Sequence, residues 1–140
     1  MTLRRILLLL ALVALPTAFS TAAADLNPGN WEVQVTTQVP GSTPATLTQN
    51  QCLRAEDAKN PGMLFGTPDK GCEFLNQRDD GKVYRFDILC KDPTATVTGS
   101  GEMRYGSDTM EGELVIRTVV STQTMDLRSR IRAQRVGPCK

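Results

Sequence analysis

The stretch MEGELVIRTVVSTQTMDLRSRIR, residues 110–132, decides the fold, because polar and apolar side chains alternate along it on both sides of a polar turn. Such alternation is typical of half-buried antiparallel strands. One register of this hairpin brings three pairs of opposite charge face to face: Glu111 with Arg132, Glu113 with Arg130, and Arg117 with Asp126. A slip of one residue would move every side chain to the other face, so three agreeing pairs predict this register.

The same alternation continues through the chain between segments rich in proline and glycine. It predicts strands over residues 31–39, 45–53, 72–78, 83–90 and 97–105, in addition to the hairpin strands 110–120 and 124–135. A short helix is predicted over Arg54–Lys59, followed by a loop from Pro61 to Gly71. We therefore predict an all-β fold, an antiparallel meander of about seven strands with one short helix, strongly curved or barrel-like. An open sheet with the helix and the loop over one face is the alternative.

The first 24 residues are predicted to be a secretory signal peptide. A basic start at Arg4 and Arg5 precedes the apolar run from Ile6 to Leu15, and the small residues Ala22–Ala24 follow. A retained membrane anchor is the alternative, but this run is too short to span a bilayer. Residues 25–140 then form one soluble, exported domain, in which no other apolar run approaches the length of a membrane span.

All four cysteines lie in the predicted mature domain. An even number in a small exported domain is typical of disulfides. A zinc site is the alternative, but the chain has no Cys-x-x-Cys pair. The count alone leaves three pairings open. If the hairpin around Gly81 sets Cys72 opposite Cys90, the remaining bridge joins Cys52 to Cys139.

The composition argues against several classes of function. Lys and Arg number 16 against 15 Asp and Glu, so the formal charge of +1 is not the strongly basic one typical of nucleic-acid binding. The chain has no histidine, which removes His-based triads and imidazole metal sites. Neither a Gly-x-Ser-x-Gly elbow nor a phosphate loop is present. We therefore expect no enzyme activity, no cofactor and no metal site.

Two charged features of the polar face are interpreted as structural. Arginines alternate over residues 128–132, and such a stripe can bind phosphate or lipid head groups. Most of it faces carboxylates across the strand, so we predict an ion-pair face in which Arg128 and Arg135 are the freer cations. Glu102 is predicted to lie beside Glu113, and paired carboxylates can hydrolyse glycosides. The arginines around this pair argue against catalysis there.

The candidate binding site surrounds two glycines, Gly99 and Gly101, which point inward from the same strand. The expected register sets Phe86 opposite Gly99 and Tyr84 opposite Gly101. The glycines either let the strand bend, with the aromatic rings covering bare backbone, or form the floor of a groove for an apolar ligand. The groove would be lined by Tyr84, Phe86, Gly99, Gly101, Tyr105, Leu114 and Ile116, with Tyr105 as a polar contact at one end. Trp31 is predicted to anchor the core rather than to stack on a ligand.

Several short motifs occur in a characteristic order: Pro28-Gly29-Asn30-Trp31-Glu32, Gln51-Cys52-Leu53, Cys72 and Cys90 flanking a hairpin, Gly99-Ser100-Gly101-Glu102, Met110-Glu111-Gly112, and Arg135-Val136-Gly137-Pro138-Cys139. With these motifs the chain resembles the exported bacterial family catalogued as domain of unknown function 3617. The resemblance implies a periplasmic protein of a Gram-negative bacterium and carries no known activity. We expect a non-enzymatic protein that binds an apolar small molecule or lipid within the curved sheet. The alternative is a module for protein–protein interaction or envelope assembly.

Overall fold

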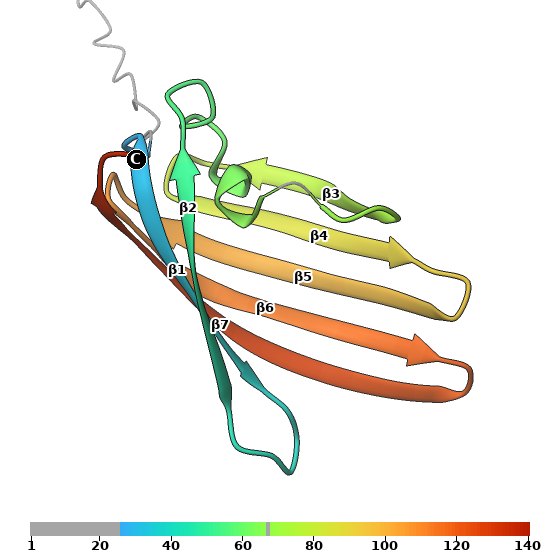
Figure 1. The fold of residues 1–140 in the computed structure, drawn as a ribbon. Helices are drawn as coiled ribbons and strands as arrows, with labels where there is room; N and C mark the ends of the chain where they lie inside the picture. Colours follow the sequence, from blue (N-terminus) through green and yellow to red (C-terminus); the bar gives the residue numbers. More distant parts are fainter. Residues whose placement is uncertain (1–25, 67) are drawn as a thin grey trace, which may run out of the picture.

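The computed structural model describes residues 26–66 and 68–140, which form a seven-stranded antiparallel sheet (Figure 1). The predicted signal peptide lies outside the described residues. The strands are β1 (Gly29–Gln38), β2 (Ala45–Leu53), β3 (Cys72–Asp79), β4 (Val83–Lys91), β5 (Ala95–Tyr105), β6 (Thr109–Val120) and β7 (Gln123–Gly137). All seven predicted strands are therefore confirmed.

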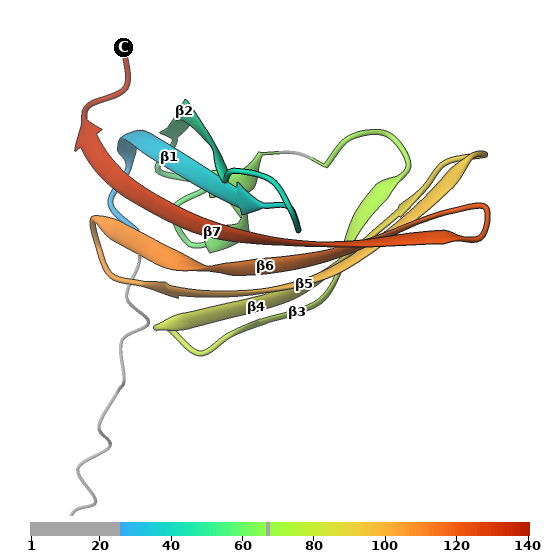
Figure 2. The same cartoon turned by 90° about the horizontal axis from the view of Figure 1, so that it is seen from below.

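The strand order across the sheet is β2-β1-β7-β6-β5-β4-β3. Strands β3 to β7 form the predicted meander, and β1 adds to β7, so the first and last strands lie side by side (Figure 2). Strands β1 and β2 run at a steep angle to β4–β6, as the twist of a sheet requires (Figure 1). Among the described strands, β2 and β3 each have one neighbour only. The sheet is open, because β2 and β3 do not pair with each other, so closure into a barrel is not found and the open sheet considered as the alternative is.

In the described part of the chain the single helical turn is η1 (Pro61–Phe65), a 3-10 helix. The prediction of a helix over Arg54–Lys59 is wrong, because these residues form consecutive turns. The side chain of Asn60 accepts a hydrogen bond of 3.0 Å from the backbone N–H of Gly62, and Pro61 occupies the first position of η1. Asn60 and Pro61 directly follow the predicted helix, but they begin η1 instead, as an N-cap followed by proline commonly does.

Three of the four registers predicted from the sequence are confirmed. In β6–β7 Arg117 pairs with Asp126, in β5–β6 Glu102 pairs with Glu113, and in β3–β4 Cys72 pairs with Cys90. The β4–β5 prediction is wrong by two residues, because Phe86 pairs with Gly101 rather than with Gly99. A shift of two residues preserves the face on which each side chain lies and changes only its neighbours. The inward face was thus correctly predicted.

Both disulfides have the predicted pairing, Cys52 with Cys139 and Cys72 with Cys90. The first ties the β2 edge of the sheet to the end of the chain, and the second joins β3 to β4. Disulfides persist in oxidising compartments, which indicates that the protein resides in one. Among the described residues, no helix has the length and hydropathy needed to cross a membrane.

Candidate functional site

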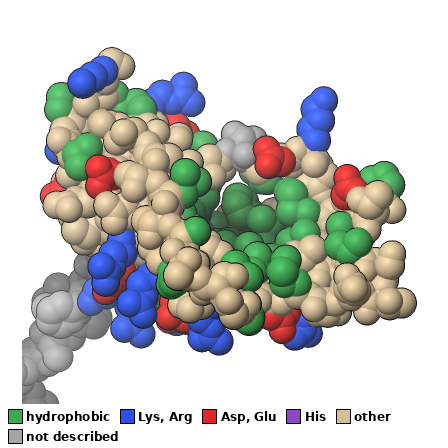
Figure 3. Space-filling view, turned by 60° about the horizontal axis from the view of Figure 1, so that its bottom comes forward, with side chains coloured by type: hydrophobic (Ala, Val, Ile, Leu, Met, Phe, Trp, Pro, Cys, Tyr) green, Lys and Arg blue, Asp and Glu red, His purple; other side chains and the backbone are tan. Residues whose placement is uncertain are grey.

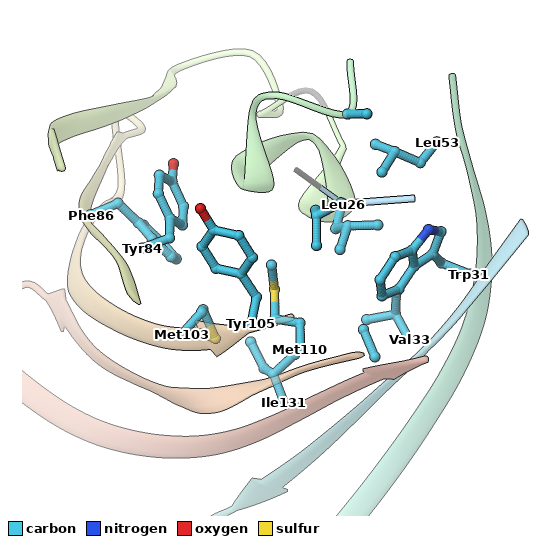
Figure 4. Close-up of a cluster of buried hydrophobic side chains, with 13 residues drawn as sticks. Leu26, Trp31, Val33, Leu53, Tyr84, Phe86, Met103, Tyr105, Met110 and Ile131 are labelled. Atoms are coloured by element: carbon cyan, nitrogen blue, oxygen red, sulfur yellow. The ribbon is translucent and has the colours of Figure 1, made fainter. Parts of the chain in front are cut away.

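The inner face of the sheet, which bears Trp31, Tyr84 and Met103, is filled at one end. Trp31 is fully buried, and its Nε1 donates a hydrogen bond of 3.0 Å to the carbonyl of Asn27, so its predicted role as a core anchor is confirmed. Figure 4 shows the aromatic and aliphatic side chains of this end pointing toward one another. Leu64 of η1 and Leu26 are also buried in the cluster. We call this part of the inner face the filled half.

Gly101 belongs to the filled half, where the ring of Phe86 lies over it. A Cβ atom at Gly101 would lie 2.5 Å from Cζ of Phe86. The Phe86 ring packs in turn against Phe74, Tyr84 and Phe65, with centroid distances of 5.2, 5.3 and 5.5 Å. Glycine is needed here because the Phe86 ring occupies the space that a side chain would take. Gly101 therefore fits the interpretation in which aromatic rings cover bare backbone, and not the one in which it forms the floor of a ligand groove.

The tyrosine hydroxyls of the filled half have partners within the protein. Tyr84 donates a hydrogen bond of 2.7 Å to Oε1 of Gln77, and Tyr105 donates one of 2.6 Å to Oδ1 of Asp79. Burial, and after it the negative charge of Asp79, raises the pKa of Tyr84 above its ordinary value. Both hydroxyls therefore serve the core, and Tyr105 is engaged by Asp79 rather than presented to a ligand.

The other end of the inner face is open. β1 pairs with β7 only from Arg128 onward, so residues 123–127 of β7 and their partners on β6 extend beyond β1 (Figures 1 and 2). Half-buried or exposed residues lie in two cross-strand rows that run from this extension onto β5 and β4: Ile88, Gly99, Ile116 and Leu127 in the first, and Val97 and Met125, on either side of Thr118, in the second. We call these six residues the open groove. Figure 3 shows a hollow lined by hydrophobic side chains on this side of the molecule.

The burial of the inner face falls row by row toward the groove. Met103 and Ile131 are completely or almost completely buried, whereas Ile116 two rows further on is half-buried and Met125 is 48% exposed. Between these rows the hydroxyls of Thr37 and Ser129 form a hydrogen bond of 2.9 Å, which satisfies both groups in the floor. A Cβ at Gly99 would lie 2.9 Å from Cγ2 of Ile88. Gly99 therefore keeps the floor of the groove low.

The predicted groove residues are divided between these two parts of the inner face. Tyr84, Phe86, Gly101 and Tyr105 lie in the filled half, Gly99 and Ile116 lie in the open groove, and Leu114 lies at the boundary. Four groove residues were not predicted from the sequence: Ile88, Val97, Leu127 and Met125. The alternation placed them on the inner face, but the error in the β4–β5 register moved the predicted groove toward the aromatic residues.

The outer face carries two of the three predicted ion pairs, Arg117 with Asp126 and Glu113 with Arg130, whereas Glu111 and Arg132 face each other in register without an ion pair. Nε and Nη2 of Arg117 donate hydrogen bonds of 2.7 and 3.0 Å to the two carboxylate oxygens of Asp126, which lowers the pKa of Asp126 below its ordinary value. Glu102 and Glu113 border a shallow depression of about 1060 Å³, and each lies within 4.0 Å of arginine nitrogens. Because arginines neutralise both carboxylates, we interpret the depression as an ion-paired surface.

Arg128 and Arg135 are not the free cations that were expected. Nη1 of Arg128 lies 3.7 Å from Oε2 of Glu113, although the direct cross-strand partner of Glu113 is Arg130, two residues further along β7. Nε of Arg135 donates a hydrogen bond of 2.7 Å to the carbonyl of Pro28. A diagonal ion pair and a backbone contact escape prediction because pairing in register considers only residues that face each other directly.

A family model described as "Protein of unknown function (DUF3617)" matches residues 26–139. The match spans all seven strands and both disulfides. No curated protein and no solved structure gives a significant match to the chain. The family description names no activity, so the function has to be argued from the geometry.

Proposed function

The chain belongs to the DUF3617 family of proteins of unknown function, and from that premise we propose that it binds a slender apolar ligand, such as one acyl chain, in the open groove. The observation that carries the proposal is the run of half-exposed aliphatic side chains beside a fully packed core. Folded proteins bury such side chains when they can, and a continuous exposed patch on an inward face is typical of a ligand site. Each methylene group buried there would contribute about 0.8 kcal/mol before the costs of binding.

The filled half supports the proposal by giving the groove a rigid closed end. Phe86 and Leu114 form the boundary, and the aromatic cluster behind them leaves no space for the ligand to pass Gly101. Sites that are largely preformed bind at a lower entropic cost than sites that must order on binding. The proposed ligand therefore lies along the extension of β4–β7 and stops at Phe86.

The proposed role is non-enzymatic and periplasmic. We assign no catalytic group to the groove, because its six residues carry no titratable or nucleophilic side chain. The carboxylates of the outer face have arginine partners and lie on the opposite side of the sheet. Export rests on the predicted signal peptide, and the two disulfides support an oxidising destination. A small exported binder of this kind would carry or sense an apolar molecule between the membranes.

A pair of neighbouring residues on β6 tests the proposal. Ile116 lies in the groove, and Val115 lies on the outer face with a similar aliphatic side chain. Ile116→Gln is expected to weaken the binding of a fluorescent fatty acid by roughly tenfold, because it places an amide against the chain, whereas Val115→Gln is expected to leave the affinity unchanged. No saturable uptake by the wild-type protein, or an equal loss in both variants, would refute the proposal.

The second candidate function is an interaction module of the envelope. It is favoured by the long unpaired edge of β2, whose residues 45–50 are all exposed. Native mass spectrometry of protein isolated from its own periplasm separates the two candidates. A co-purifying small mass supports the ligand binder, and a second polypeptide supports the interaction module.

A further inference from the structure

The two edges of the sheet differ in how they are protected against pairing with another strand. Edge strands of soluble proteins commonly carry charges, proline or a bulge that prevents such pairing. The β3 edge carries Glu73, Arg78 and Asp79, and its pairing with β4 shifts register after Leu75. Asn76 lies at this irregularity with a φ of 50°. The β3 edge is therefore protected.

The β2 edge has none of these protections. Its sequence ATLTQNQCL contains no charged residue and no proline, and it pairs with β1 over nine consecutive residues without a register shift. The first six residues of β2 are all exposed, and Leu47 is 63% exposed. Only the end of β2 is occupied, by the disulfide at Cys52 and the burial of Leu53. A straight, uncharged edge of this length is a template for one more strand.

We propose that the β2 edge pairs with the β2 edge of a second copy of this chain, in antiparallel orientation about a two-fold axis. A register centred on Leu47 sets Leu47 against Leu47 of the partner subunit and Thr46 against Thr48 of the partner subunit. No pair in this register brings like charges together, since residues 45–53 carry none. The contact is isologous, so it closes after two copies.

A second copy is the occupant that leaves no unprotected edge. The paired sheets form one continuous sheet of twice seven strands whose two outer edges are both β3, the protected edge. A strand from an unrelated protein would also cover β2. The new outer edge would then belong to that protein, and its protection would depend on that protein's sequence. Because residues directly opposite each other on neighbouring strands share a face, both inner faces lie on the same side of the dimer. The two open grooves then open in the same direction.

The experiment measures the oligomeric state of the full mature chain by sedimentation velocity over a range of concentrations. The wild-type protein is expected to be a dimer in exchange with monomer. Leu47→Lys is expected to raise the dissociation constant by at least roughly tenfold, because it opposes two like charges across the axis. Val136→Lys is the matched control, since Val136 is an aliphatic residue of β7 that is 54% exposed and lies away from the β2 edge. Circular dichroism confirms that both variants are folded.

A charge swap tests the register itself. Leu47→Glu alone is expected to be monomeric, and an equal mixture of Leu47→Lys and Leu47→Glu chains is expected to regain the dimer. Hydrogen exchange of the amides in residues 45–50 should slow as the wild-type concentration rises. A wild-type chain that stays monomeric overturns the proposal, and so does a dimer that the Leu47 and Val136 variants weaken equally.

Discussion

Replacing Gly101 with alanine tests whether the sheet is filled at its centre. The added Cβ would lie 2.5 Å from Cζ and 2.6 Å from Cε1 of Phe86, distances that real contacts do not reach. The ring of Phe86 must therefore move, and it is held by three other aromatic rings. Overpacking of a well-packed core costs about 1–3 kcal/mol. For a domain of this size the expected fall in Tm is about 3–10 °C.

Gly106→Ala is the matched control for this substitution. A Cβ at Gly106 would meet only Oγ1 of Thr109, at 3.9 Å, so the same chemical change has room there. Thermal and urea unfolding of the two variants should show a loss of stability at Gly101 and little change at Gly106. Adding Phe86→Leu to Gly101→Ala should recover part of the loss, with a coupling of at least about 0.5 kcal/mol.

The result for Gly101 also separates the core from the groove. In our assignment Gly101→Ala loses stability but keeps the uptake of a fluorescent fatty acid, because the open groove begins beyond Phe86. If the groove extended over Gly101, the variant would keep its stability and lose uptake. An unchanged unfolding midpoint for Gly101→Ala would refute the filled interior.

Three further predictions concern the core, a disulfide and an ion pair. Trp31→Ala should lower the free energy of unfolding by about 3–5 kcal/mol in urea titrations, because the side chain is fully buried; a variant that unfolds like the wild type would contradict this. Removing the Cys72–Cys90 bridge by a double alanine substitution should cost about 3 kcal/mol through loop entropy, measured under non-reducing conditions, and an unchanged midpoint would argue against the bridge. The carboxyl of Asp126 should titrate by NMR below its ordinary value of 3.8, so the stability it contributes is present above that pH and lost as the pH falls through the lowered pKa. Arg117→Gln should return the titration of Asp126 to its ordinary range, and no movement would mean that the pair does not form in solution.

The strand registers were predictable wherever the sequence contained pairs that constrain each other. Glu111, Glu113 and Arg117 each met a residue of opposite charge in a single register of β6–β7, so the prediction had independent checks. The β4–β5 hairpin offers one such pair in its observed register, Arg85 with Glu102 on the outer face, and no second pair to check it. Gly99 and Gly101 are chemically identical, and Phe86 could cover either of them, so the sequence left two registers that differ by two residues. The structure selects the one that places Phe86 on Gly101.

The helical turn η1 was misplaced because the same residues can end one helix or begin another. Asn60 and Pro61 follow a stretch of good helix formers, which favoured a helix before them. Asn60 instead caps η1, and this turn carries Leu64 into the core. The position of Leu64 depends on the sheet that it covers, which lies far from it in sequence. Local preference could not determine it.

The division of the inner face into a filled and an open part follows from unequal strand lengths. Strands β6 and β7 have 12 and 15 residues, whereas β1 and β2, which continue the sheet beyond β7, have 10 and 9. The short strands and η1 can cover only part of the long ones, and the uncovered part begins where β1 ends opposite Arg128. The alternation of side chains nevertheless continues to the tip of the β6–β7 hairpin, so apolar residues face inward where nothing in the described chain covers them. A chain that maintained this pattern only to fill a core would have no use for Leu127 and Met125, and a ligand in the open groove gives them one.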